Sequence, residues 1–438
     1  MIASESVRVP GSGQRVERFV LANGLRVVLN PDRCAPVAGV AVVYDVGMRS
    51  EPEGRTGFAH LFEHMMFQGS ANLDRAAHSR LVQGAGGTFN GSTHLDYTEY
   101  NDLVPSGALE RVLYLEADRM RGPLLTEESL RNQIAVVKEE IRVNVLGKPY
   151  GGFPWLKLPP VMFGTFANAH DGYGSFADLE AAALPEATAF FGKYYAAGNA
   201  ALSLSGDFDP DHAARLVERY FGDVPARPAP ERPCFAEPPL TRERRAAYTD
   251  ELAPLPAVAA AWRVPDPIAD MPGYLPYIAL ATALTDGESS RLADRLALRE
   301  RMVTNVGGYV GFMREPFETR DPTALVLQAH LPGGGDPDKV LAVVDEELDR
   351  LATDGLVPGE LARVRARMVT RVLRECDPVV GRAVRLGVWE LQRGHPGLLR
   401  ELPGLLAEVT ADGVRAAAAA LRPHGRARID VLPGGGGR

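Results

Sequence analysis

The sequence is poor in cysteine and lacks long apolar runs, and both shortages limit what it can encode. Its 438 residues include three cysteines, Cys34, Cys234 and Cys376, which are far apart and odd in number. This pattern predicts neither a disulfide framework nor a cysteine metal cluster. No apolar segment approaches the roughly 18 residues of a membrane helix, and residues 1–19 hold no apolar core of signal-peptide length. We therefore expect a soluble, cytoplasmic protein.

An excess of basic charge is also missing. The chain carries 56 acidic and 48 basic residues, and its formal net charge is −8. It has no basic run and no alternation of basic with aromatic residues, so the charge pattern predicts no nucleic-acid partner. The length is sufficient for two or three domains with sizeable cores.

Hydrophobic periodicity predicts a mixture of strands and helices. Residues 19–30 are typical of two short strands around an Asn-Gly turn, and the Val-rich residues 37–47 of a buried central strand. Residues 58–67 indicate a mostly buried helix. Residues 86–104 alternate small, polar and aromatic side chains, which favours an edge strand or a hairpin. Residues 187–210 predict a helix followed by a strand.

Proline clusters near the middle of the chain. Six of the 18 residues in 223–240 are proline, so this segment is predicted to be a stiff, extended linker at a domain boundary. The ends of the two halves, 194–210 and 420–435, share a plan of helix end, small turn and alternating strand. Aligning Gly206 with Pro433 carries His60 onto Gly287. This offset predicts that the second half repeats the first without its histidines.

The segment GFAHLFEHMMFQGS, residues 57–70, contains the pattern His-x-x-Glu-His, with His60, Glu63 and His64. On an α-helix, residues i and i+4 lie about 40° apart around the axis, so both imidazoles can reach one ion. Bound zinc lowers the pKa of its water to about 7. The Glu63 carboxylate can take up the proton and later pass it to a leaving amine. The alternative is a pair of structural histidines held by hydrogen bonds.

A catalytic zinc site needs a third protein ligand and an open position. A carboxylate suits this chemistry, and helical periodicity leaves four candidates open: Glu110, Glu116, Glu139 and Glu140.

The motif and its surroundings resemble the pitrilysin and insulysin family of zinc peptidases, the inverzincins. The likeness extends over 40–57, 86–100, 194–210 and 287–309, and is strongest for short bacterial members and mitochondrial processing peptidase subunits. It implies an α+β fold of two homologous domains, each a mostly antiparallel sheet flanked by helices, which face each other as half of a chamber. The implied boundaries are 1–222 for the zinc-bearing domain, 223–240 for the linker, and 241–438 for a domain without the metal motif.

The resemblance also selects the third ligand. The family carries a glutamate far downstream of the second histidine and directly before an apolar residue, and Glu140 precedes Ile141 in that place. Glu139 would lie about 100° around the helix, on a solvated face. Many family members have a further glutamate that supports the histidines without binding the metal. This sequence has Gln133 at that position. Its amide either bonds an imidazole without charge or belongs to a plain surface residue. The implied site consists of the zinc ligands His60, His64 and Glu140 and the catalytic Glu63.

Active family members often carry an Arg and a Tyr in the second domain that hold the substrate and stabilise the oxyanion. The matching stretch, 322–340, contains neither. Since one oxyanion donor can contribute about 3 kcal/mol, the resemblance implies a heterodimer in which a homologous subunit supplies this pair. Arg301 and Tyr309 are nearby alternatives within the chain. A homodimer, or a chain active alone, is the competing arrangement.

The resemblance implies that residues 88–93 belong to an edge strand that binds the peptide substrate. Gly91, Ser92 and Thr93 have small side chains, which let a second backbone approach and pair as a strand. Asn90 can bond the peptide amide beside the scissile bond. The alternative is an ordinary hairpin turn at Asn90 and Gly91. His94 is expected at the surface, away from the metal.

These inferences predict a metalloendopeptidase with Zn²⁺ as its cofactor, which hydrolyses oligopeptides or extended precursor or leader segments. The alternative is a non-catalytic assembly subunit of a processing-peptidase-like complex. Such relatives usually lose one or more of the zinc-binding positions, and all of them are present here.

Overall fold

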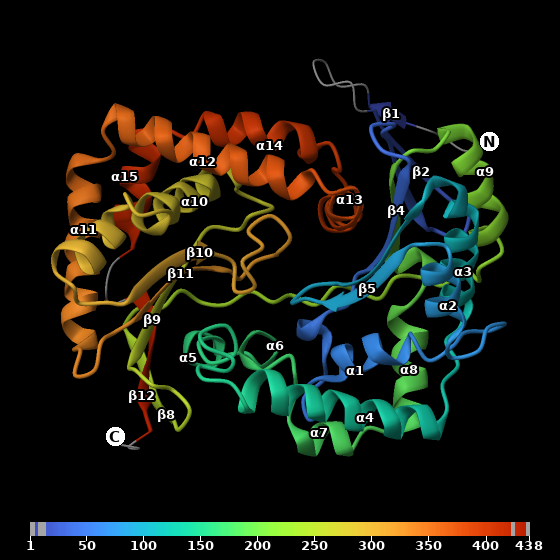
Figure 1. Cartoon of the computed structure of the whole chain (residues 1–438), viewed down its shortest axis with the longest axis horizontal. Helices are drawn as coiled ribbons and strands as arrows, with labels where there is room; N and C mark the ends of the chain where they lie inside the picture. Colours follow the sequence, from blue (N-terminus) through green and yellow to red (C-terminus); the bar gives the residue numbers. More distant parts are fainter. Residues whose placement is uncertain (1–4, 8–14, 422–424, 435–438) are drawn as a thin grey trace. The chain divides into compact units, whose positions relative to one another are not determined.

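The computed structural model describes residues 5–7, 15–421 and 425–434, which form two compact units, each with one sheet flanked by helices (Figure 1). The first unit comprises Met1–Lys138, Asp171–Pro233 and Val372–Leu402. The second comprises Glu139–His170, Cys234–Arg371 and Pro403–Arg438. The predicted α+β fold with two helix-flanked sheets is confirmed.

The first unit contains a seven-stranded sheet with the order β1-β2-β3-β7-β4-β6-β5. Only β3 and β7 run parallel among these neighbours. Strands β2 and β3 form the two-stranded turn expected over 19–30. Strand β4 is the buried strand expected over 37–47, and β5 is the edge strand expected within 86–104. The strand bounds are β1 (Glu5–Val7), β2 (Val16–Val20), β3 (Arg26–Pro31), β4 (Val37–Tyr44), β5 (Thr88–Thr93), β6 (Thr98–Pro105) and β7 (Ala200–Gly206).

Helices surround this sheet and bury its apolar side chains in one core. Short 3₁₀ turns at Met48–Ser50, Ser106–Ala108 and Ala197–Asn199 connect the elements. The helices are α1 (Phe58–Met65), α2 (Ala77–Gly84), α3 (Leu109–Arg121), α4 (Glu127–Ile141), α7 (Phe176–Glu180), α8 (Leu184–Tyr194), α9 (Pro210–Phe221) and α13 (Val379–Arg393).

Helix α13 comes from the second half of the sequence but packs on the first sheet, against β3, β4 and β7. Glycines on both partners permit the close approach. A Cβ on Gly39 of β4 would lie 3.0 Å from the Val380 Cα, and one on Gly387 would lie 2.8 Å from a Val43 methyl. Arg382 fixes the helix further, because its guanidinium pairs with Asp32 at 2.7 Å.

The second unit contains a five-stranded sheet with the order β10-β11-β9-β12-β8. Its strands are β8 (Arg244–Asp250), β9 (Ala257–Arg263), β10 (Asn305–Val310), β11 (Ala324–His330) and β12 (Arg426–Pro433). Two π-helical segments, Arg142–Leu146 and Ala293–Arg299, also belong to this unit. Its helices are α5 (Pro159–Met162), α6 (Phe166–Ala169), α10 (Met271–Thr285), α11 (Pro337–Asp354) and α15 (Ala411–Ala420), while α12 (Pro358–Cys376) and α14 (Leu398–Ala407) span the unit boundary.

The two sheets share one topology. The order β3-β7-β4-β6-β5 in the first corresponds to β8-β12-β9-β11-β10 in the second, with the same parallel and antiparallel pairings. This agrees with an internal repeat. A uniform offset does not hold, because fewer residues separate β5 from β10 than β7 from β12. Gly287 lies in the loop after α10 rather than on a helix like His60.

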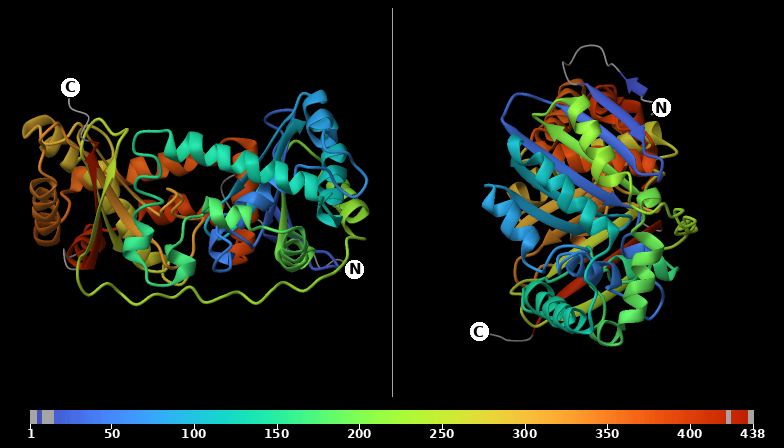
Figure 2. Two further views of the ribbon diagram at one scale, coloured as in Figure 1. Left: turned by 90° about the horizontal axis from the view of Figure 1, so that it is seen from below. Right: turned by 90° about the vertical axis from the view of Figure 1, so that its right-hand side faces the viewer.

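The linker residues 225–240 contain no helix or strand and run extended (Figure 2). The compact units do not follow the continuous halves 1–222 and 241–438, because 372–402 packs in the first unit and 139–170 in the second. Boundaries between the units fall inside the continuous helices α4, α12 and α14. The division at the linker therefore stays a prediction about how the halves are related, rather than a description of the packed units.

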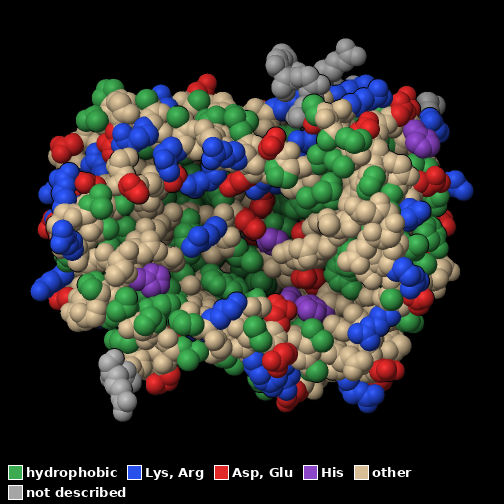
Figure 3. Space-filling view, viewed as in Figure 1, with side chains coloured by type: hydrophobic (Ala, Val, Ile, Leu, Met, Phe, Trp, Pro, Cys, Tyr) green, Lys and Arg blue, Asp and Glu red, His purple; other side chains and the backbone are tan. Residues whose placement is uncertain are grey.

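The surface in Figure 3 shows Lys and Arg interspersed with Asp and Glu on the visible face, without a broad field of one sign. Within the described residues, no helix combines the length and apolarity needed to cross a membrane.

Candidate metal centre

Helix α1 carries the histidine pair, and a buried carboxylate fixes its first turn. Glu51, 4% exposed, accepts hydrogen bonds from the backbone N–H of Gly57 at 2.9 Å and of Ala59 at 2.7 Å. A negative charge at a helix N-terminus is favourable because the free N–H groups and the helix dipole point toward it. Gly57 itself has φ 81°, and a Cβ there would lie 2.3 Å from the Tyr173 carbonyl oxygen. Glycine is thus required at the start of this helix.

The buried face of α1 is apolar and points into the core; it consists of Phe58, Ala59, Leu61, Phe62 and Met65. This packing leaves His60, Glu63 and His64 on the remaining face. The two imidazole centroids lie 4.9 Å apart with perpendicular planes. The ring of Tyr173 meets His60 edge to face at 5.1 Å.

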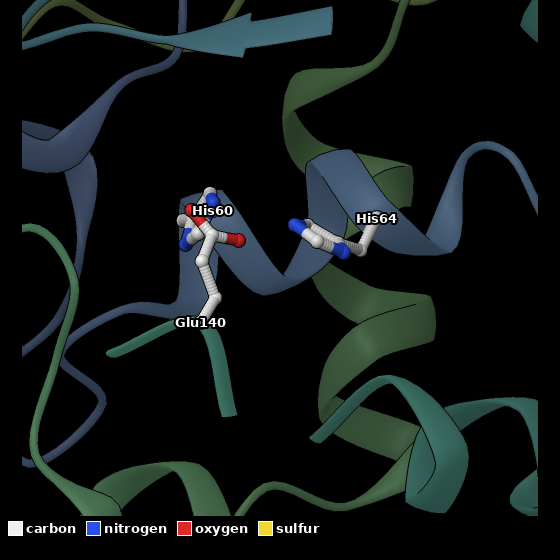
Figure 4. A group of neighbouring side chains, drawn as sticks. All are labelled: His60, His64 and Glu140. Atoms are coloured by element: carbon white, nitrogen blue, oxygen red, sulfur yellow. The ribbon is translucent and has the colours of Figure 1, made fainter. Parts of the chain in front are cut away.

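Glu140, in the last turn of α4, completes a three-residue group with these histidines. One ligand atom from each of His60, His64 and Glu140 lies within 4.8 Å of the others. Figure 4 shows both imidazoles projecting from α1 and the Glu140 carboxylate directed toward them. Donor atoms around a tetrahedral zinc are roughly 3.3 Å apart, given zinc–ligand distances of about 2 Å. Small side-chain rotations would close the group on one ion, so two imidazoles and a carboxylate fit Zn²⁺.

The other three candidate glutamates lie elsewhere. Glu139 is exposed and pairs with the arginine three residues later at 3.1 Å, as expected for a solvated helix face. Glu110 is exposed and accepts a hydrogen bond from the Tyr220 hydroxyl. Glu116 is buried and pairs with Arg119. Geometry therefore brings only Glu140 of the four to the histidine pair.

The edge strand β5 packs against the face of α1 that carries Glu63. The Thr93 hydroxyl donates a hydrogen bond to Glu63 Oε2 at 2.6 Å. A Cβ on Gly91 would lie 3.2 Å from Glu63 Oε1 and 3.0 Å from the Phe67 ring. Gly91 and Thr93 thus face α1, and strand alternation places Asn90 on the opposite face, where it is exposed.

Two neighbouring residues differ from a sequence expectation. Gln133 is 4% exposed, so the alternative of a plain surface residue is wrong. Within the described part of the chain, its amide makes no hydrogen bond to either imidazole, and its supporting role stays a prediction. His94 is 9% exposed and stacks on Tyr97 at 4.1 Å, so the expected surface position is wrong.

A second cluster of potential ligands, His78, Asp102 and Glu116, lies behind β5. His78 Nε2 lies 3.1 Å from Asp102 Oδ1, and Glu116 pairs with Arg119. Burial raises the pKa of Asp102 to about 6 and lowers that of His78 to about 4. The buried guanidinium of Arg119 already supplies the positive charge that a cation would bring. This cluster is therefore an internal ion network.

Three residues that shape the centre are difficult or impossible to recognise from the sequence alone. Glu51 lies in the polar sequence EPEGRTG, residues 51–57, before α1. An acidic residue shortly before a helix is nevertheless typical of a capping carboxylate. The sequence indicates only that Thr93 is a small residue in a strand. Its contact with Glu63 depends on the packing of β5 on α1. Tyr173 reaches His60 from a distant loop, and no local pattern predicts this.

Comparison with known proteins identifies the family. The model for "Insulinase (Peptidase family M16)" matches residues 26–146, and the model for "Peptidase M16 inactive domain" matches residues 183–368. The chain belongs to peptidase family M16, the insulinase and pitrilysin family. Fold and family together define it as a peptidase-type protein of two helix-flanked sheets.

Relatives of this chain are known from bacteria. The chain is 26% identical to "Zinc protease PqqE" of Helicobacter pylori over 80% of this chain and 77% of that protein. It is 25% identical to an uncharacterized zinc protease of Streptomyces coelicolor, over 92% and 86% of the two chains. The crystal structure of a protease from Helicobacter pylori superposes with a TM-score of 0.87 at 22% identity, covering 99% of this chain and all of the other.

Proposed function

We propose that this chain is a zinc metalloendopeptidase subunit whose Zn²⁺ is held by His60, His64 and Glu140. The observation that carries the proposal is the convergence of these three ligand atoms within 4.8 Å, beside Glu63 on the same helix. The names of the relatives as zinc proteases support the choice of metal.

Glu63 is the proposed general base. Bound zinc would supply Lewis acidity toward water and the peptide carbonyl. The Glu63 carboxylate would accept the proton of the attacking water and then deliver it to the amine that leaves. The Thr93 hydroxyl holds Oε2 of this carboxylate at 2.6 Å and restricts its rotation.

The substrate is proposed to be an oligopeptide or an extended precursor or leader segment that pairs with β5. This strand ends the order of the first sheet, so β6 is its only partner among the described strands. A peptide adding to its outer side would gain main-chain hydrogen bonds. It would run past Asn90 through Thr93, close to Glu63.

A homologous subunit that supplies an Arg and a Tyr is the proposed partner, with a homodimer as the competing arrangement. Strand β11, within the stretch 322–340, contains neither residue type. The alternative pair is not assembled, because Arg301 is exposed and the guanidinium over the Tyr309 ring, at 4.6 Å, belongs to Arg314. Peptide hydrolysis measured with the isolated chain, then with a partner encoded beside it, tests this. Strong turnover by the isolated chain would contradict the heterodimer.

Substitution of the proposed base separates catalysis from metal binding. Glu63→Gln should retain about one equivalent of zinc and lower kcat by at least about a hundredfold. Glu53→Gln, on the exposed loop before α1, should leave both unchanged. Full activity of Glu63→Gln with zinc retained would exclude Glu63 as the base.

The second candidate function is a non-catalytic assembly subunit. The family description "inactive domain" covers residues 183–368 only and does not favour this candidate over the peptidase. Very little zinc in wild-type protein purified with ample metal would support this function over the peptidase. The cytoplasmic location stays a prediction.

A further inference from the structure

A cavity of about 360 Å³ lies in the first unit and contains no residue of the proposed metal centre. Strands β2 and β3, the end of β4, linker residues 229–232 and the C-terminal end of α13 form it. This volume is at the lower end of the range for small-ligand sites. Its charged lining consists of Arg18, Arg26, Arg232, Arg393, Asp45 and Glu390.

Arginines outnumber carboxylates in this lining, and one arginine forms no ion pair with a described residue. Arg18 pairs with Glu390 at 2.8 Å, and Arg232 pairs with Asp45 at 2.5 Å. Arg26 is half-buried, yet it makes no hydrogen bond or ion pair with any described residue. Burial lowers the pKa of Arg26, and the nearby Arg232 and Arg18 add to this, while the carboxylates of Glu390 and Asp45 offset part of it. A desolvated cation of this kind would be stabilised by an anion in the cavity.

The end of α13 opposes an anion only weakly. Helix carbonyls at a C-terminus carry partial negative charge, and α13 ends here at Arg393. Arg232 already donates to the Leu391 carbonyl at 2.7 Å and neutralises part of that charge. The cavity therefore keeps an excess of positive charge around Arg26.

The cavity also offers an acceptor. Glu390 is 2% exposed, and its Oε2 atom accepts no hydrogen bond from the described residues. A buried acceptor without a donor is costly. A hydroxyl group on a bound ligand would satisfy it.

We propose that this cavity binds a small polyanion that carries carboxylate or phosphate groups together with a hydroxyl. Arg26 and Arg393 hold the anionic groups, and Glu390 Oε2 accepts a hydrogen bond from the hydroxyl. The ligand connects three distant segments of the chain, 18–26, 229–232 and 390–394. The site is independent of the proposed peptidase chemistry.

Titration calorimetry on the full chain tests the site with two probes, citrate and inorganic phosphate, at low and at physiological salt. We expect one binding event per chain, and the probe that binds more tightly identifies the anionic group preferred. Arg26→Gln should weaken binding at least tenfold. Arg80→Gln, an exposed arginine of α2 paired with Asp74, should change it less than twofold.

A second variant controls for the case that Arg26→Gln fails to fold. Arg393→Gln alters the part of the lining that α13 contributes and should also weaken binding at least fivefold, with circular dichroism confirming a native fold. The proposal is overturned if wild-type protein binds neither probe at low salt. It is equally overturned if folded Arg26→Gln or Arg393→Gln binds as tightly as wild type.

Discussion

The Thr93 hydroxyl donates a 2.6 Å hydrogen bond to Oε2 of Glu63 and so joins the edge strand β5 to the histidine-bearing helix. Replacing Thr93 by Val removes the donor at nearly constant volume. Because a hydrogen bond to a charged group contributes about 1.5–3 kcal/mol, we expect kcat to fall roughly tenfold or more. Steady-state kinetics with a fluorogenic peptide measure this.

Thr93→Ser keeps the hydroxyl and provides the matched control. It should retain activity within about threefold, and both variants should bind zinc like wild type. Equal activities of the Val and Ser variants would show that the hydrogen bond does not position Glu63.

Gly91 leaves room for the Glu63 side chain, and an added methyl group would remove it. The Cβ of Gly91→Ala would lie 3.2 Å from Glu63 Oε1 and 3.0 Å from the Phe67 ring. We expect a loss of about 1–2 kcal/mol in unfolding free energy, with lower kcat. Urea unfolding measures the former. Gly107→Ala, where a Cβ meets nothing within 4 Å, should be close to neutral; an equal loss there would refute the packing explanation.

Glu139 and Glu140 are adjacent in sequence but differ in their proposed roles. Outer partners of metal ligands contribute about 10–100-fold to metal affinity, so loss of a ligand itself in Glu140→Gln should weaken zinc binding by more than that. Glu139→Gln should bind zinc normally, because Glu139 pairs with a neighbouring arginine on an exposed face. Competition with a chromogenic chelator compares the two, and similar zinc affinities would argue against Glu140 as the ligand.

Glu51 stabilises the first turn of α1 through two backbone N–H groups. Glu51→Gln removes the charge and turns its amide N–H toward one of the two backbone N–H groups, so unfolding free energy should fall by about 1–2 kcal/mol. Chemical denaturation checks this. Glu53→Gln, which is exposed, should stay within about 0.5 kcal/mol of wild type. Parallel losses in both would remove the capping explanation.

Asp102 makes stability depend on pH. Burial raises its pKa to about 6 from 3.8, so its contribution to stability is fully present below pH 3.8 and is lost as the pH rises through about 6. The loss is at most about 3 kcal/mol. Asp102→Asn should therefore gain stability relative to wild type between pH 4 and pH 7.5, measured by urea unfolding at each pH. Asp74→Asn, exposed on the surface, should show no such trend, and a constant difference for Asp102→Asn would contradict the raised pKa.

Local patterns in the sequence predict the parts of the fold that depend on local physics. A continuous apolar run predicts the buried strand over 37–47, and alternation predicts an edge strand or hairpin at 86–104. The apolar composition around His60 and His64 predicts the buried helix that carries them. The choice of Glu140 among four glutamates needs the family resemblance, because helical periodicity says only which face a residue occupies. The structure then places Glu140 beside the histidines.

Long-range packing is what local patterns miss. Nothing near residue 380 indicates that α13 covers the first sheet, although Gly39 and Gly387 permit that contact. The approach of Tyr173 to His60 depends in the same way on how distant loops meet. Such contacts are selected by the shape of the complete core, which no window of the sequence contains.

The position of α13 also has a consequence for the order in which the protein is made. All strands of the first sheet have been synthesised by residue 206, but the helix that covers β3, β4 and β7 ends at residue 393. At about 5–20 residues per second, the ribosome needs roughly 10–40 seconds to produce the chain between them. During that interval α13 does not yet cover the apolar face of the nascent sheet. The first unit therefore reaches its native state only late in translation.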